Sequence, residues 1–113
     1  MNDVTGFMWL DQNGGCRAPA QMTTHHLFYS IKMMWNHLVP QEYKIIPYRI
    51  YGLNPARFTE KYCKLAVHEL SKELLTREDW WHYYGQMIQI HDRMKQMEGW
   101  SNETHTIRKQ IQG

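Results

Sequence analysis

Apolar residues recur along the chain at spacings that indicate three helices. In residues 24–39 they fall at positions i, i+1, i+4, i+7, i+8 and i+11, which forms one continuous stripe on a helix. The stripe comprises Leu27, Phe28, Ile31, Met34, Trp35 and Leu38. Pro40 then ends the helix, because proline lacks the N–H that the next turn requires. The pattern therefore predicts a first helix over residues 24–39.

A second helix is predicted over residues 55–75. Asn54 can cap its N-terminus, and Pro55 suits its first turn, where a missing N–H breaks no hydrogen bond. Seven residues at helical spacing then form the face that we expect in the core: Phe58, Tyr62, Cys63, Ala66, Val67, Leu70 and Leu74.

A third helix is predicted over residues 77–98. Thr76 and Asp79 have the spacing of a capping box, and Gly99 suits the end of the helix. Its apolar and aromatic residues cover an arc of about 160–200°, whereas one core contact needs little more than about 100°. They are Trp80, Trp81, Tyr83, Tyr84, Met87, Ile88, Ile90, His91 and Met94. The excess arc indicates either burial on two sides within the chain or a surface for a partner.

Two other segments have the composition of β-strands. Residues 6–19 predict a hairpin, because Phe7–Leu10 can form a strand and "NGG" at Asn13–Gly15 suits a tight turn. Residues 43–53, "YKIIPYRIYGL", are rich in β-branched and aromatic residues. They predict a third strand, which Pro47 places at a sheet edge or a bulge.

These elements predict a single α+β domain over residues 1–113, with a short tail at 100–113. A small antiparallel sheet, made from the hairpin and the third strand, would pack against the three helices. Hydrophobic residues make up 42% of the chain and charged residues 21%, which is the composition of a folded globular protein. No apolar run is long enough for a transmembrane helix, so no membrane contact is expected.

The N-terminal residues "MNDVTGFMWLDQ" contain no basic region followed by an apolar run, so we expect no signal peptide and a cytoplasmic location. In that compartment Cys16 and Cys63 are expected to be buried thiols rather than a disulfide.

Three of the seven histidines fall in "QMTTHHLFYSIKMMWNH", which raises the question of a metal centre. His26 and His37 would share one helix face but lie about 16 Å apart along it. Ligand atoms lie about 2 Å from a zinc ion, so this pair cannot hold one. A helix start explains the stretch better, with Thr23 as N-cap and with Met22 and Leu27 as a hydrophobic staple. No metal site and no cofactor are expected.

Nucleophilic catalysis has no support in the sequence. Ser30, Ser71 and Ser101 lie in no nucleophile-elbow motif, and Cys63 falls on a predicted buried face. There is no glycine-rich phosphate loop, because "NGG" is assigned to the hairpin. We therefore expect a protein that is not an enzyme, and a metal-assisted hydrolase built from distant histidines is only the second alternative.

The residues 9–27, "WLDQNGGCRAPAQMTTHHL", resemble a short module of small phage and prophage proteins. The module is a polar hairpin turn followed by Met-Thr-x-x-His-Leu. The resemblance implies a phage-borne accessory protein in the host cytoplasm, many of which act by binding host proteins. It implies no catalytic residue.

Two surfaces are candidates for binding. An aromatic and methionine surface on the third helix would meet a partner protein or a second copy of the chain, because these residue types are enriched in interface cores. Its proposed members are Trp81, Tyr83, Ile90, Met94 and Met97. A basic stripe on the second helix could meet phosphates or an acidic protein. The stripe comprises Arg57, Lys61, Lys64, His68 and Lys72.

The leading hypothesis is a non-enzymatic protein-binding module. It would be a phage or prophage accessory protein that sterically inhibits a host complex such as a CRISPR effector, in the manner of an anti-CRISPR. The first alternative is a small nucleic-acid-binding protein that uses the basic stripe. The net charge of +2 is too small to support this alternative by itself.

Overall fold

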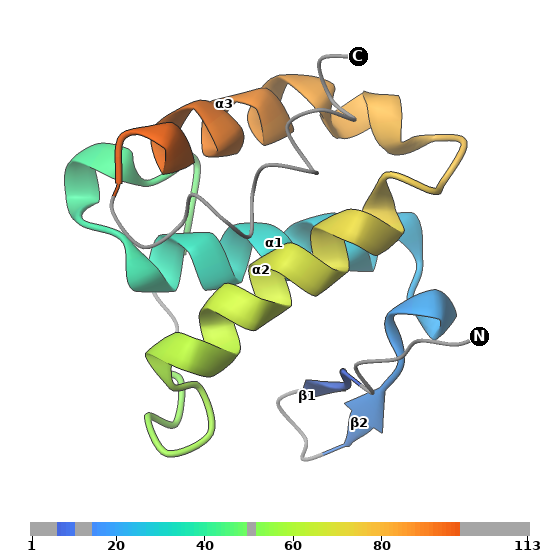
Figure 1. Ribbon diagram of the computed structural model, residues 1–113, viewed down its shortest axis with the longest axis horizontal. Coiled ribbons are helices and arrows are strands. Elements are labelled where there is room, and N and C mark those ends of the chain that lie inside the picture. Colours follow the sequence, from blue (N-terminus) through green and yellow to red (C-terminus); the bar gives the residue numbers. More distant parts are fainter. Residues whose placement is uncertain (1–6, 11–14, 50–51, 98–113) are drawn as a thin grey trace.

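A computed structural model describes residues 7–10, 15–49 and 52–97. Its three α-helices are α1 (Thr24–Leu38), α2 (Glu60–Leu74) and α3 (Tyr84–Lys95). A short antiparallel hairpin precedes them, formed by β1 (Trp9–Leu10) and β2 (Cys16–Arg17). The helices α1 and α2 cross as a packed pair, with α3 along one side of the pair and the hairpin on the other (Figure 1). The predicted α+β class is confirmed, and none of the helices among the described residues is long and apolar enough to cross a membrane.

The start of α1 is built as predicted. The Thr23 hydroxyl accepts a hydrogen bond from the backbone N–H of His26 at 3.1 Å, which satisfies one of the unpaired donors of the first turn. Met22 and Leu27 are both buried, as expected for a hydrophobic staple. The double histidine therefore belongs to a helix start, and α1 ends at Leu38, shortly before Pro40.

The second helix begins later than predicted. Instead of covering residues 55–75, α2 starts at Glu60, and its N-cap is Thr59, whose hydroxyl accepts from the N–H of Tyr62 at 3.1 Å. Asn54 caps a separate turn, where its side-chain oxygen accepts from the backbone N–H two residues further on at 2.9 Å. The chain thus contains two successive N-cap signals, and only the second opens the helix.

The predicted third helix over residues 77–98 is divided. Its first part is a 3₁₀-helix, η3 (Trp80–Tyr83), and α3 follows from Tyr84. A 3₁₀-helix has about 3.0 residues per turn, whereas an α-helix has about 3.6. The aromatic residues of η3 therefore do not continue the apolar stripe of α3. The buried residues of α3 are Met87, Ile90, His91 and Met94, an ordinary apolar stripe. Most of the broad arc is therefore core.

The capping box predicted at the third helix is wrong. The Thr76 hydroxyl instead donates to a backbone carbonyl in the last turn of α2 at 2.6 Å. Asp79 accepts from the Thr24 hydroxyl at 2.9 Å, which ties the start of η3 to the start of α1. Beside this bond, Tyr83 stacks on Phe28 with ring centroids 4.5 Å apart. These contacts hold η3 against α1.

The third strand predicted over residues 43–53 is absent from the described part of that segment. The 3₁₀-helix η2 (Gln41–Tyr43) is followed by an irregular stretch in which the backbone of Ile45 pairs with a side chain. Asn36 of α1 accepts from the Ile45 N–H at 2.8 Å and donates to the Ile45 carbonyl at 3.1 Å. These bonds occupy the N–H and the carbonyl of Ile45, which therefore cannot pair with the hairpin, and Pro47 has no N–H to offer.

The hairpin packs on α2 through one tyrosine. The Tyr62 hydroxyl accepts from the Leu10 N–H at 2.9 Å and donates to the Met8 carbonyl at 3.1 Å. Phe7 stacks on the same ring with centroids 5.6 Å apart, and Trp9 is buried beside it. Burial raises the pKa of Tyr62 to about 12, so the hydroxyl keeps its proton and serves as both donor and acceptor. The hairpin turn at Asn13 and the tail at 100–113 lie outside the described residues.

The two cysteines differ in environment, and both are free thiols. Cys63 is buried in α2, as predicted, and burial raises its pKa to about 11. Cys16 is exposed on β2, so the prediction that it is buried is wrong. The strand is only two residues long, and neither of its residues reaches the core.

Candidate functional site

The five residues predicted to form an aromatic and methionine surface are divided by the fold. Trp81 is 63% exposed, whereas Ile90 and Met94 are buried in the core of the chain. Tyr83 and Met97 are half-buried and pack against that core. Ile90 and Met94 point inwards because they belong to the buried stripe of α3, which removes them from any surface for a partner.

A smaller aromatic surface remains around η3. We call it the η3 cluster, and it comprises Trp80, Trp81, His82 and Tyr84. The Trp81 indole stacks on the His82 ring with centroids 4.0 Å apart, and Tyr84 is 47% exposed. Trp80 contacts the Tyr84 ring at 5.6 Å and packs against the core, which anchors the cluster from below.

The basic stripe of α2 is partly neutralised by its own helix, which leaves Arg57 and the exposed Lys61 without a carboxylate partner among the described residues. Three of its members meet carboxylates: Lys64 with Glu60 at 3.0 Å, Lys72 with Glu69 at 3.5 Å, and His68 with Glu69 at 4.0 Å, the last an ion pair only when the imidazole is protonated. Arg57 precedes α2 and lies in the turn before it. A phosphate approaching this face would compete with carboxylates already in place, so the stripe is a weak candidate for nucleic acid.

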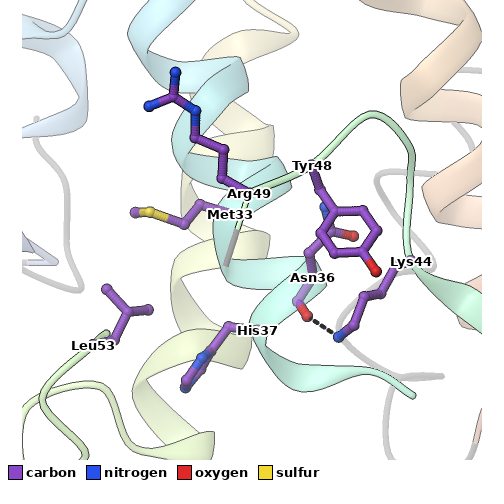
Figure 2. A pocket seen from close by; sticks show the side chains of 7 residues that line it. All are labelled: Met33, Asn36, His37, Lys44, Tyr48, Arg49 and Leu53. Carbon is purple, nitrogen blue, oxygen red and sulfur yellow. Dashed lines mark hydrogen bonds between the residues drawn. The ribbon is translucent and has the colours of Figure 1, made fainter. Parts of the chain in front are cut away.

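The structure reveals a further candidate that the sequence patterns did not predict, a groove beside α1. It consists of two adjoining hollows of about 360 Å³ and about 260 Å³. The larger is lined by Tyr29, Lys32, Met33, Asn36, Pro47, Tyr48 and Arg49. The smaller shares four of these residues and adds His37, Lys44 and Leu53 (Figure 2). We call the two hollows together the α1 groove.

The two walls of the α1 groove come from different segments. One wall is a stripe of α1 at spacing i, i+3, i+4 and i+7, formed by Tyr29, Lys32, Met33 and Asn36. The other wall is the stretch 44–49, which the Asn36–Ile45 hydrogen bonds hold beside the helix. In Figure 2 the Arg49 side chain extends along α1 past Met33, while the Tyr48 ring turns toward Lys44.

The lining of the groove carries positive charge without a carboxylate. Its formal cations are Lys32, Lys44 and Arg49. The Lys44 ammonium donates to the Val39 carbonyl at 2.7 Å and to the Asn36 carbonyl, so it caps the C-terminus of α1. Among the described residues, no carboxylate pairs with Lys32 or Arg49.

Lys32 is the least exposed cation of the groove. Only 8% of the residue is accessible, and this burial lowers the pKa of its ammonium group. Lys32 lines the larger hollow from the α1 wall. An ammonium group that has lost part of its hydration and has no carboxylate nearby would gain more than an exposed lysine from a bound anion.

The described residues offer no metal centre, because no group of three or more His, Cys, Asp or Glu side chains lies close enough together to hold an ion. Comparisons with models of known protein families, with curated proteins and with solved structures gave no match. The phage origin suggested by residues 9–27 therefore stays a prediction, and the geometry of the surfaces carries the functional argument.

Proposed function

We propose that this chain is a non-enzymatic protein-binding module that contacts its partner through the η3 cluster. The observation that carries the proposal is the 63% exposure of Trp81 on η3, with Tyr84, 47% exposed, three residues further on. Tryptophan and tyrosine that enter a pocket of a partner are typical binding hot spots, because they bury much apolar area with few rotatable bonds.

The mounting of the cluster supports the same proposal. The hydrogen bond between Asp79 and Thr24 and the stacking of Tyr83 on Phe28 hold η3 on α1. A side chain presented from a fixed backbone loses less conformational entropy on binding than one on a mobile loop. Trp81 is thus exposed on an ordered platform.

The biological part of the proposal follows from the resemblance to phage proteins. The partner would be a host protein complex, a CRISPR effector for example, and inhibition would be steric because the chain only has to occupy a surface. Two observations test this part: phage genes next to the coding gene, and loss of inhibition of the purified complex when Trp81 is replaced.

The experiment begins with the mass of the protein in solution, by light scattering over a range of concentration. A monomer leaves the η3 cluster free for a different protein, and a dimer that Trp81→Ala dissociates would make the partner a second copy of the chain. Partners captured by the wild-type chain are then purified and their affinity is measured with Trp81→Ala. We expect a loss of about 2 kcal/mol, or roughly 30-fold, as for an interface hot spot.

Leu65→Ala is the matched control, because Leu65 is also an exposed apolar residue but lies on α2. Its affinity should stay within about 0.5 kcal/mol of the wild type, as for a residue outside the interface. Equal affinity of Trp81→Ala and wild type for every purified partner would refute the role of the cluster.

A further inference from the structure

The α1 groove has the features of an anion site rather than of an unused surface depression. Lys32 and Arg49 line the same hollow, and no carboxylate among the described residues pairs with either. Like charges held together repel unless an anion comes between them. The groove therefore carries an uncompensated charge that a negatively charged ligand would neutralise.

The chemistry of the two cations suits a phosphate group. The planar guanidinium of Arg49 can donate two parallel hydrogen bonds to phosphate oxygens, and the Lys32 ammonium adds a compact charge. The Arg49 side chain extends along α1 away from Lys44 (Figure 2), and it lines the larger hollow together with Lys32. Both side chains could thus contact one phosphate from opposite walls.

Aromatic rings accompany the cations on both walls. Tyr29 of α1 is 52% exposed, and Tyr48 lies on the facing stretch. A planar base can stack on such rings whatever its identity, because every base has an aromatic face. The volume of about 360 Å³ falls within the usual range for sites that bind small organic ligands.

We propose that the α1 groove binds a nucleoside phosphate, with the phosphate between Lys32 and Arg49 and the base on the ring of Tyr29 or Tyr48. The ligand is either a free nucleotide or one nucleotide of a single strand, since both present the same chemistry. The site lies on different residues from the η3 cluster and does not depend on the protein-binding function.

The groove should not read the identity of the base. Among the described residues that line the larger hollow, Asn36 alone has an amide side chain, and both of its polar atoms already bond to the Ile45 backbone. Stacking and phosphate contacts are tolerant of sequence. Binding should therefore differ little between oligonucleotides of different sequence and should weaken as salt is added.

The test uses the full chain and a fluorescein-labelled oligothymidylate of about ten nucleotides, followed by fluorescence anisotropy. We expect Arg49→Ala and Lys32→Gln each to weaken binding about tenfold, because each removes a charge-assisted phosphate contact. Lys61→Ala is the matched control, because Lys61 is an exposed lysine of the α2 stripe and is not among the residues that line the groove; its affinity should stay within about twofold of the wild type.

Competition identifies the ligand. If ATP displaces the labelled strand at concentrations similar to those of unlabelled oligothymidylate, the ligand is a free nucleotide. If only unlabelled oligothymidylate displaces it, the ligand is one nucleotide of a single strand. Either result supports the proposal. Equal displacement by inorganic phosphate or by polyglutamate would overturn it, because the rings would then have no role. If the chain bound none of these probes, that result would also overturn the proposal.

Two further variants separate binding from folding. Arg49→Lys keeps the charge but loses the planar fork, so it should bind more tightly than Arg49→Ala and less tightly than wild type. Tyr29→Leu should weaken strand binding at least about fivefold, as loss of one stacking contact does. Circular dichroism and denaturant unfolding of each variant establish that it is folded. If the Arg49 variants and Tyr29→Leu bound the strand with wild-type affinity, the proposed site would be refuted.

Discussion

The α1 groove and the basic stripe of α2 both collect positive side chains, yet carboxylates lie beside these cations only on α2. On α2, Lys64 and Lys72 meet carboxylates at 3.0 Å and 3.5 Å. In the groove, Lys32 and Arg49 have no carboxylate partner among the described residues. The stripe is thus compensated at two of its four formal cations, whereas the groove has a free positive charge in a concave site.

The surroundings of a cation therefore decide whether it can bind an anion, more than the number of cations on a helical wheel does. The acidic partners on α2 come from the same helix at spacings i+3 and i+4, so they could be counted in the sequence. The cations of the groove come from α1 and from the stretch 44–49, and only the tertiary fold brings them together.

The largest effect should come from removing the side chain that builds the groove. Asn36→Ala leaves the buried N–H and carbonyl of Ile45 without their partners, at roughly 1–3 kcal/mol for each group. We expect the free energy of unfolding to fall by about 3 kcal/mol and binding in the groove to be lost. Denaturant unfolding followed by circular dichroism measures the change.

Lys61→Ala serves as the control for that substitution, because Lys61 is exposed on α2. Its free energy of unfolding should change by no more than about 0.5 kcal/mol. If Asn36→Ala changed the free energy of unfolding equally little, contacts other than these hydrogen bonds would hold the stretch 44–49 beside α1.

Asn36 also marks the limit of what the sequence could predict about the fold. Helix α1, its Thr23 cap and the core face of α2 follow from periodicity and capping, which are local patterns. The stretch 43–53 has the composition of a strand, but the buried Asn36 amide of α1 bonds the backbone N–H and carbonyl of Ile45, which a strand would pair. Nothing in the spacing of that stretch indicates where its hydrogen bonds go.

The candidate sites show the same limit. The residue type of Trp81 predicts a binding residue, and Trp81 is exposed. Ile90 and Met94 belong to the same predicted arc but are buried, because η3 shifts the helical phase. The groove had one local signal, the spacing of Tyr29, Lys32, Met33 and Asn36 on α1. Its second wall could not be foreseen while residues 43–53 were assigned to the sheet.

Two lysine substitutions, one in the groove and one in the stripe, should change the free energy of unfolding in opposite directions. Lys32→Met removes an ammonium group that burial disfavours, so at pH 7 the free energy of unfolding should rise, by up to about 1 kcal/mol. Lys64→Met removes the pair with Glu60 and should lower it by about 0.3–0.5 kcal/mol. Thermal or denaturant unfolding compares the two variants with wild type.

The pH dependence of the Lys32 effect distinguishes desolvation from better packing of methionine. The pKa of Lys32 lies below its unfolded value of 10.5, so the unfolded chain binds more protons between the two values. Wild type should therefore regain stability relative to Lys32→Met as the pH rises through the folded pKa toward 10.5. An advantage of Lys32→Met that stays constant over this range would instead come from packing.

The smallest effect tests whether carboxylates silence the α2 stripe. The double variant Glu60→Gln, Glu69→Gln keeps the shape of both side chains but removes the negative charges beside Lys64 and Lys72. The freed lysines should raise the affinity for the labelled strand about two- to threefold at low salt, and the gain should vanish near about 0.5 M salt. Adding Arg49→Ala to the double variant isolates the stripe from the groove. If the stripe then bound the strand as tightly as the wild-type groove does, the concave site would have no advantage over an exposed row of lysines. The two regions would then differ only in whether carboxylates pair with their cations.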